Sequence, residues 1–462
     1  MINNYIVDLT IANDIGYKTL QQYQFLPLVK TDIYIIVAIY NNNYIDKIRT
    51  LFHTPIKFIT VTKNELQFEL HNFEIKYKIF NLALKAQQLN TTQTTNKTAI
   101  YNFCDKLFLF AIKINASDIH FETIKYAVII RFRIDGILVQ FFKFEYEFFP
   151  IISSILKLFA SLDISQRRLP QDGRFSRKIG NDFYDFRVST LPTISGESIV
   201  LRILDNKKAF LKLDQIGFNN EVYQKINTNI NKTNGLILIT GPTGSGKTTT
   251  LYSILNQLNK IDKKIITAED PIEYNINGIM QVNINEQIGL DYATILKNIL
   301  RQDPDIIMIG EIRDQKSLQI AIQASLTGHL VIATLHTNSA AKTINRLLDL
   351  KAPAYLLAST LRLIVSQRLI RVLCNNCKEQ ATYKEHIIYK AKGCKQCNLT
   401  GYISREIVTE ILEIDEQIAN LINTNKIQDI QKIINYTTIS DEIYNKVLQG
   451  ITSLDEYYRY EI

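Results

Sequence analysis

The chain has 462 residues, and at roughly 100–200 residues per domain this length predicts two to four domains. No stretch approaches the roughly 18 consecutive apolar residues that span a bilayer, and the first residues lack the features of a secretory signal, so we expect a soluble protein in the cytosol. The basic residues behind the net charge of +8 are spread along the chain, which indicates mild affinity for a membrane surface at most and no nucleic acid partner.

Residues 1–95 mix short apolar runs with polar turns, a pattern typical of a small α/β or α+β domain. The tract at 89–97, LNTTQTTNK, is poor in apolar residues and predicts a linker. Residues 96–205 alternate between apolar and polar positions, as in the segment 128–134, and this alternation predicts strands joined by hairpin turns. We therefore expect a second, α+β domain dominated by sheet.

Residues 206–220 are expected to link this domain to a third one at 221–372, where short apolar segments alternate with helical periodicity. Such alternation predicts parallel βαβ units. The expected strands lie at 236–240, 264–268, 305–309 and 330–335. Because ligands of open α/β sheets bind at the carboxyl ends of the strands, the polar residues after these strands should form one site.

The segment after the first of these strands reads GPTGSGKT and fits the phosphate-loop pattern GxxxxGK[ST], with a strand before it and a helical pattern after it. Its glycines let backbone N–H groups surround phosphates, and the amino end of the helix adds partial positive charge. We expect ATP, with Lys247 on its β- and γ-phosphates and Thr248 on Mg²⁺. The expected nucleotide-binding residues are Gly241, Pro242, Thr243, Gly244, Ser245, Gly246, Lys247 and Thr248.

Acids and a histidine follow the other expected strands. Glu311 is expected to orient or activate the attacking water, and Glu269, the first of three acids within residues 269–273, to order metal-bound water. Each acid taken alone is equally consistent with a solvated loop charge, but together behind a phosphate loop they favour catalysis. His336 ends the last strand, where a neutral histidine can donate to a γ-phosphate, whereas His329 at its start fits a core or capping role equally well.

Four of the five cysteines form two CxxC pairs in a chain without an export signal, which favours a metal over disulfides. Four thiolates suit a closed, structural Zn²⁺ site with tetrahedral geometry, and redox pairs are the alternative. The expected zinc ligands are Cys374, Cys377, Cys394 and Cys397. Cys104 stands alone among apolar residues, and we interpret it as a core residue.

With these motifs in place, the chain resembles the secretion-superfamily ATPases that drive type II secretion and type IV pilus assembly. The resemblance is close over residues 116–412 and is carried by five segments. They are ASDIHFE at 116–122, RFRIDG at 131–136, RLPQDGR at 168–174, the acidic box at 300–314 and the histidine box at 326–338. The resemblance implies an α/β fold with a RecA-like P-loop ATPase core, preceded by a PAS-like α+β domain and a small amino-terminal domain.

The resemblance also implies a ring hexamer and assigns roles to single residues. The residues implied to serve the nucleotide are Lys247, Glu269, Glu311 and His336. Two arginines of the preceding domain, Arg187 in DFRVSTLP and Arg202 in SIVLRIL, are implied to reach toward the γ-phosphate. Such contacts are worth about 10³–10⁵ in the rate of phosphoryl transfer, so domain closure becomes part of the chemistry.

The cysteine pairs resemble the zinc module of the assembly and secretion branch, through GCKQCNLTG at 393–401, whereas the retraction branch of pilus motors lacks this module. We place the module at 373–402 and a helical region at 403–462. The sixteen residues between Cys377 and Cys394 are fewer than the family pattern leads us to expect.

The function implied is that of a cytoplasmic motor, peripherally associated with the inner membrane, that drives pilus or pseudopilus assembly. Its implied partners are a polytopic inner-membrane platform protein and a cytoplasmic or membrane adaptor, with residues 1–95 as the docking domain.

Three alternatives stay open. A DNA-uptake pseudopilus motor would share all these motifs. A nucleic-acid translocase would need a basic, aromatic-lined channel, and the cluster of Arg362, Arg368 and Arg371, which we interpret as a solvated helix face or ring contact, is a weak candidate for it. A nucleotide-gated scaffold that barely hydrolyses ATP is disfavoured by the intact Glu311.

Overall fold

The computed structural model describes residues 7–88, 93–134, 136–204, 211–397, 400–430 and 437–460, which fold as two compact units. The first unit comprises the described parts of Met1–Asn206 together with Cys374–Cys377 and Lys392–Tyr402. The second comprises those of Lys207–Leu373, Lys378–Ala391 and Ile403–Ile462. Within the described ranges, no helix is long and apolar enough to cross a lipid bilayer.

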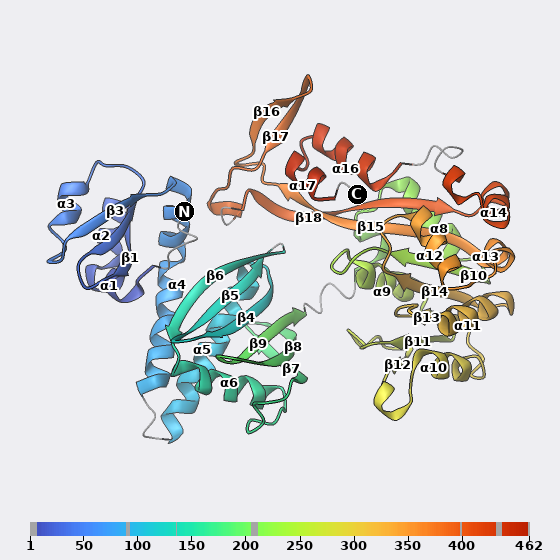
Figure 1. The fold of residues 1–462 in the computed structure, drawn as a ribbon, viewed down its shortest axis with the longest axis horizontal. Coiled ribbons are helices and arrows are strands. Elements are labelled where there is room, and N and C mark those ends of the chain that lie inside the picture. The colour runs from blue at the N-terminus through green and yellow to red at the C-terminus, as the bar shows by residue number, and fades with distance from the viewer. Residues whose placement is uncertain are drawn as a thin grey trace. The chain divides into compact units, whose positions relative to one another are not determined.

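The first unit begins with a small sheet in the order β1-β2-β3 that helices flank (Figure 1). Its central strand is paired on both edges and is buried at every position. The elements are α1 (Leu9–Ile15), α2 (Tyr17–Tyr23), β1 (Phe25–Lys30), β2 (Ile35–Ile39), α3 (Ile45–Arg49) and β3 (Ile56–Thr60). The mixed character predicted for this part of the chain is confirmed.

Two long helices follow, α4 (Lys63–Gln88) and α5 (Gln93–Lys113). The linker predicted at 89–97 was therefore wrong for residues 93–97, which form the first turns of α5, and residues 89–92 lie outside the described part of the chain. A polar composition does not distinguish the polar first turns of a helix from a linker.

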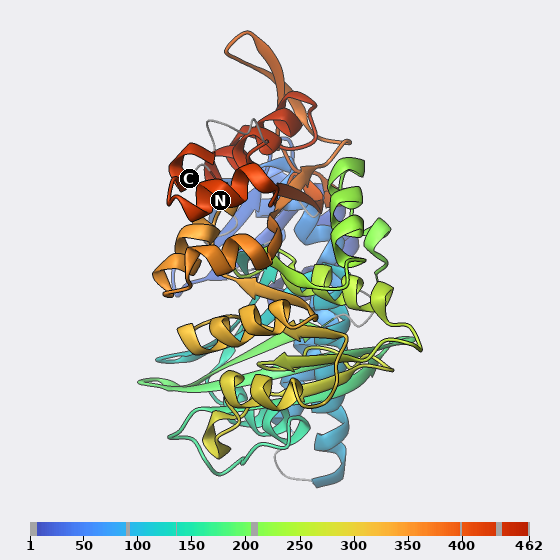
Figure 2. The same cartoon turned by 90° about the vertical axis from the view of Figure 1, so that its right-hand side faces the viewer.

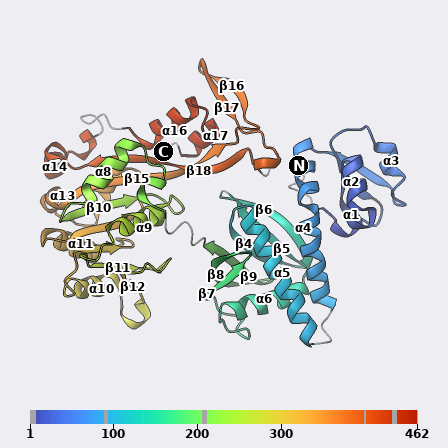
Figure 3. The same cartoon turned by 180° about the vertical axis from the view of Figure 1, so that it is seen from behind.

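An antiparallel sheet in the order β6-β5-β4-β9-β8-β7 completes the first unit, as the alternating pattern predicted. Its elements are β4 (Ala116–Ile124), β5 (Ala127–Ile134), β6 (Ile137–Glu145), α6 (Phe148–Phe159), β7 (Gln171–Ile179), β8 (Asp182–Thr193) and β9 (Gly196–Leu204). Helices α5 and α6 cover one face (Figure 3), where Phe108 meets Phe186 at 4.7 Å between ring centroids and Phe103 meets Phe148 at 5.0 Å. Apolar residues from both sides of residue 95 share this core, and a domain boundary there stays a prediction.

The second unit is built on a sheet in the order β12-β11-β13-β14-β10-β15-β18, in which β12, β11, β13, β14, β10 and β15 run parallel. The strands are β10 (Gly235–Thr240), β11 (Ile265–Glu269), β12 (Met280–Asn283), β13 (Ile306–Ile309), β14 (Leu330–Leu335), β15 (Leu361–Leu373) and β18 (Tyr402–Glu413). The four predicted strands are confirmed to within one residue at each end, because continuous β-branched apolar runs identify strands that are buried on both faces.

Helices cover both faces of this sheet (Figure 1, Figure 2). Alternate residues of each strand pack into one of two apolar clusters, the first with α8 and α9 and the second with α10 to α14. The helices are α8 (Asn220–Ile230), α9 (Lys247–Leu258), α10 (Tyr292–Ile299), α11 (Gln315–Leu326), α12 (Ala340–Asp349), α13 (Ala354–Thr360), α14 (Glu416–Asn423), α16 (Ile439–Leu448) and α17 (Leu454–Tyr460). This is the layered architecture that the alternation of strands and helices predicted.

The helical region predicted at 403–462 was wrong for its first part, since β18 extends to Glu413 and joins the sheet beside β15. The run IVTEILE in this strand is rich in β-branched residues, which fit a pleated sheet better than a helix. A hairpin of β16 (Glu379–Tyr383) and β17 (His386–Lys390) connects the two cysteine pairs along the chain. Residues 206–210 of the linker predicted at 206–220 lie outside the described part of the chain. Helix α8 begins at the last residue of this predicted linker, Asn220.

Candidate nucleotide site and cysteine cluster

The order of the sheet in the second unit places four chemically active strand ends next to one another. The phosphate loop follows β10, and His336 follows β14, which pairs directly with β10. Glu311 follows the next strand, β13, and Glu269 ends β11 beside it. Neighbouring parallel strands end on the same edge of a sheet, so these groups share one edge, where ligands of such folds bind.

The phosphate loop needs glycine for two separate reasons. At Gly241 a Cβ atom would lie 2.5 Å from Ser245 Oγ and 2.6 Å from the carbonyl oxygen of Gln367, so no side chain fits. Gly244 and Gly246 adopt φ values of 80° and 90°, in the left-handed region that other residues rarely occupy. Together they turn the chain tightly from β10 into α9.

Buried polar side chains support the loop from beneath. Gln367, fully buried on β15, donates from Nε2 to the carbonyl oxygen of Ser245 at 2.9 Å and accepts from Thr250 Oγ1 at 3.0 Å. The next residue, Arg368, is 2% exposed and donates to the Gln367 carbonyl oxygen at 2.9 Å and to Asn338 beyond β14 at 3.0 and 3.1 Å. Sequence reasoning missed Gln367, although a Gln-Arg pair inside the apolar run LRLIVSQRLIRVL was a usable signal.

Lys247 is held close to its own loop. Its ammonium group donates to the carbonyl oxygens of Gly241 at 2.7 Å and Pro242 at 3.1 Å. Burial lowers the pKa of Lys247 to about 8, with a further contribution from the positive charge of Arg368, while Glu311 opposes the shift. The lysine is therefore charged at neutral pH but close to its titration range.

Glu311 and His336 face each other at 3.3 Å, between Oε1 of the carboxylate and Nε2 of the ring. The other oxygen of Glu311 accepts from Arg313 Nε at 2.7 Å, and Arg313 also pairs with Asp270 at 3.1 Å. Burial lowers the pKa of His336, and the charge of Lys247 adds to this effect, so the ring is mainly neutral at pH 7. A carboxylate beside a neutral imidazole can accept a proton from water.

Glu269 differs from the sequence-based expectation in its surroundings. Its side chain is 3% exposed and accepts three hydrogen bonds. The donors are the Tyr252 hydroxyl, Thr267 Oγ1 at 2.6 Å and Gln281 Nε2 at 3.0 Å. The structure thus places Glu269 inside a buried network, which leaves little of its carboxylate free to order water.

The two arginines implied for the γ-phosphate belong to the first unit. Arg187 on β8 and Arg202 on β9 are direct cross-strand neighbours, on the face of the sheet opposite its phenylalanine core. Arg202 donates from Nε to Asp118 at 3.1 Å, and Arg133 approaches the same carboxylate at 3.8 Å. Because Asp118 accepts from Nε of the half-exposed Arg202, this acid orients the guanidinium group relative to the sheet.

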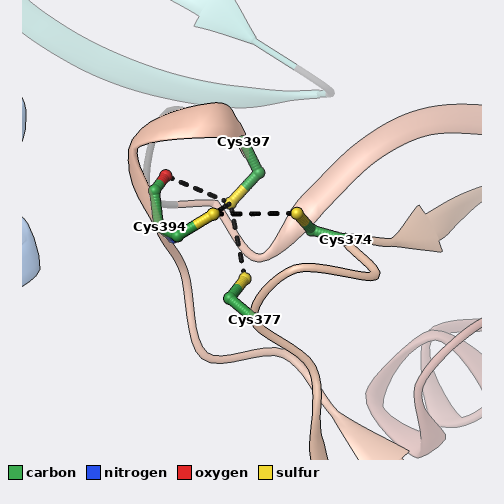
Figure 4. Close-up of side chains that lie close together, drawn as sticks. All are labelled: Cys374, Cys377, Cys394 and Cys397. Atoms are coloured by element: carbon green, nitrogen blue, oxygen red, sulfur yellow. Dashed lines mark hydrogen bonds between the residues drawn. The ribbon is translucent and has the colours of Figure 1, made fainter.

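The four paired cysteines converge in the first unit (Figure 4). Their sulfur atoms all lie within 4.8 Å of one another, and the pairs Cys374–Cys394, Cys377–Cys397 and Cys394–Cys397 are each 3.7 Å apart. A tetrahedral site with Zn–S bonds of about 2.3 Å has sulfur–sulfur edges of about 3.8 Å, whereas a disulfide needs about 2.05 Å. The four residues fit a closed zinc site, and the backbone N–H groups of Cys394 and Gly401 donate to Cys397 Sγ.

Three further sequence interpretations have clear outcomes. His329 lies 3.0 Å from the carbonyl oxygen of Ala324 at the end of α11, which favours the capping role. Cys104 is fully buried, as expected of a core residue, and burial raises the pKa of its thiol. The arginine cluster was wrongly interpreted as a solvated helix face, because it lies on β15, with Arg368 buried and Arg371 paired with Glu456 at 2.7 Å.

A phosphate loop between a parallel strand and a helix, beside strand-end acids, defines a P-loop ATPase. The chain belongs to the family described as Type II/IV secretion system protein, whose sequence model matches residues 93–459. The resemblance stated from the motifs is confirmed, and so is the mixed α/β fold class with a P-loop core. The protein is an ATPase of this family.

Relatives from both secretion and pilus systems match most of the chain. The type II secretion system protein E of Pseudomonas aeruginosa is 42% identical over 365 residues, which cover 76% of this chain and 73% of the relative. The type IV pilus assembly ATPase PilB of Acinetobacter baylyi is 36% identical over 489 residues, which cover 98% and 84%. Among solved structures, the pilus retraction motor PilT with bound ADP matches 77% of this chain and 96% of its own, with a TM-score of 0.57 and 27% identity.

The lowered pKa of Lys247 predicts that nucleotide affinity depends on pH. Bound phosphates favour the charged lysine, so raising the pH through about 8 removes that charge from the free protein and weakens binding. We expect the Kd for ATP to rise about tenfold between about pH 8 and about pH 9.5, with proton uptake on binding. Fluorescence titration tests this, and Lys247→Arg, whose charge persists, should flatten the profile. A Kd for the unaltered protein that is constant over this range would contradict the account.

Proposed function

We propose that the protein is a hexameric motor that hydrolyses ATP to drive assembly of a pilus or pseudopilus. The main support is that the phosphate loop and the Glu311–His336 pair lie next to each other along one edge of the sheet. The same chain also holds a tetracysteine cluster. The names of the relatives support it, since they belong to type II secretion and type IV pilus assembly.

In this proposal each residue at the edge of the sheet has one task. Lys247 binds the β- and γ-phosphates, and Thr248 at the start of α9 binds Mg²⁺. Glu311 positions the attacking water and takes its proton, while neutral His336 donates to the γ-phosphate. The buried hydroxyl of Ser245, which has no hydrogen-bond partner among the described residues, fits a loop built to receive phosphate oxygens.

Domain closure is the second part of the proposal. Arg187 and Arg202 complete the nucleotide site from the first unit and neutralise the charge that develops on the γ-phosphate. Asp118 holds the Nε side of Arg202. Hydrolysis is thereby coupled to movement, which the motor passes to an inner-membrane platform protein while residues 1–95 dock on an adaptor. The protein then works in the cytoplasm, peripherally attached to the inner membrane.

Removal of single catalytic groups should separate binding from turnover. Lys247→Ala is expected to abolish ATP hydrolysis, because the phosphates lose their charged ligand. Glu311→Gln should still bind ATP but turn it over about 10²–10⁴-fold more slowly, because a general base of this kind contributes about that much. Phosphate release is measured with the assembled oligomer, and the exposed Lys260→Ala serves as control. Turnover by Lys247→Ala at the unaltered rate would refute the assignment.

Partners decide between the alternatives. A motor for pilus, secretion or DNA-uptake pseudopili should be stimulated by the cytoplasmic part of its platform protein. Stimulation by single-stranded or duplex DNA instead would favour a nucleic-acid translocase, and no hydrolysis with any of these would favour a nucleotide-gated scaffold.

We also propose that the tetracysteine cluster binds one structural Zn²⁺. Its thiolates are then ligands only, in a closed site without a catalytic position. The second pair lies against α4, whose Asn64 amide donates to the Gly393 carbonyl oxygen, so metal binding braces this part of the first unit.

Elemental analysis of the purified chain should find one zinc per protein. The double variant Cys394→Ser with Cys397→Ser should lose it and melt at a lower temperature, because metal binding adds directly to folding free energy. Cys104→Ala should keep its zinc, since that thiol is buried away from the cluster. Equal zinc content in the double variant and the unaltered protein would contradict the assignment.

A further inference from the structure

Tyr252 is a buried tyrosine that joins the phosphate-loop helix to the acidic strand end. It lies on α9, the helix that begins with Lys247, and it is 1% exposed. Its hydroxyl donates to Glu269 Oε2 and accepts from the backbone N–H groups of Glu273 at 3.2 Å and Tyr274 at 3.5 Å. One hydroxyl therefore contacts the end of β11 and the loop that follows it.

The capacity of this hydroxyl is fully used. A phenol has one proton to donate and two lone pairs to accept with, and all three are engaged. Both backbone groups can only donate, so the proton must point to Glu269. Burial also raises the pKa of Tyr252, which keeps the proton on the phenol at any physiological pH.

The same geometry fixes the orientation of Glu269. Thr267 and Gln281 both donate to Oε1, which uses both lone pairs of that oxygen, whereas Tyr252 is the one donor to Oε2 among the residues that the structure describes. Thr267 and Gln281 lie on β11 and the adjacent β12, so they hold the carboxylate to the sheet. Tyr252 alone among these three donors holds it to α9.

We propose that Tyr252 is a positioning residue that fixes the acidic loop, residues 269–273, to the helix bearing Lys247 and Thr248, and so sets the affinity of the nucleotide site for Mg²⁺. The inference rests on the proposed function, in which Thr248 binds the metal. Tyr252 does not touch nucleotide or metal. Glu269 acts as the anchor of the loop through which the tyrosine works.

Tyr252→Phe removes only the hydroxyl. The edge-on contact between its ring and Tyr274, at 5.9 Å between centroids, needs no hydroxyl and is retained. Thr267→Val is the matched control, because it also removes one hydrogen bond to Glu269, keeps the side-chain shape and leaves the tie to α9 intact. Melting temperatures of both variants establish that each is folded.

Two quantities are measured with the full chain. They are the Mg²⁺ concentration that gives half-maximal ATP hydrolysis and the Mg²⁺ concentration that gives half-maximal binding of a fluorescent ATP analogue. Tyr252→Phe should raise both at least about fivefold, as loss of a hydrogen bond to a charged group predicts, with Mg²⁺-free nucleotide affinity unchanged. Thr267→Val also removes a hydrogen bond to this carboxylate but should leave the Mg²⁺ requirement within about twofold of the unaltered protein, because the tie from Tyr252 on α9 remains.

An unchanged Mg²⁺ requirement in Tyr252→Phe would overturn the inference. An equal shift in Thr267→Val would overturn it too, because the effect would then come from loss of any hydrogen bond to Glu269 and not from the tie to α9. A purely structural tyrosine would lower only the melting temperature. If the unaltered protein bound nucleotide without hydrolysing it, the proposed function would fail while the binding measurement still tested Tyr252.

Discussion

The buried amide of Gln367 is the contact on which the nucleotide site depends. It lies on β15, beside the strand that leads into the phosphate loop, and it holds both the loop, through Ser245, and the following helix, through Thr250. Its backbone carbonyl fills the space where a side chain on Gly241 would lie. Because a buried amide left unpaired is costly, these contacts favour one loop conformation before any ligand binds, and preorganisation of this kind lowers the cost of binding phosphate.

The order of the strands in the sheet also determines which charged side chains lie near the phosphate loop. The phosphate loop places Lys247 near the buried Arg368, and burial lowers the pKa of the lysine to about 8. Glu311 offsets part of this positive charge and stands beside a mainly neutral His336. A polyphosphate thus meets the charge of Lys247 at an edge that also holds the carboxylate of Glu311 and backbone N–H groups directed toward anions. The site is suited to bind the phosphates of a nucleotide and then to accept a proton from water at Glu311.

The parallel strands and the location of the nucleotide site were predictable because local sequence patterns specify them. Apolar β-branched runs identified the parallel strands, and the phosphate-loop motif located the site between one of them and a helix. The polar pair within an apolar run marked Gln367, but the contacts of Gln367 and Tyr252 were not predictable, since each acts through partners far along the chain or across the sheet. Glu269 was predicted as an acid at a strand end that orders metal-bound water, but only the fold brings Thr267, Gln281 and Tyr252 around it.

The central claim is that buried polar contacts hold the phosphate loop ready for nucleotide, and Gln367→Leu tests it most directly. Leucine keeps an apolar bulk of similar size but leaves the Ser245 carbonyl and the Thr250 hydroxyl without this partner, at about 1–3 kcal/mol each. The control is Ser366→Ala, which lies on the same strand as Gln367 and removes a buried hydrogen bond to Thr240 on β10. The account predicts a Kd for ATP at least about tenfold higher in Gln367→Leu than in Ser366→Ala, and equal Kd values in the two folded variants would contradict it.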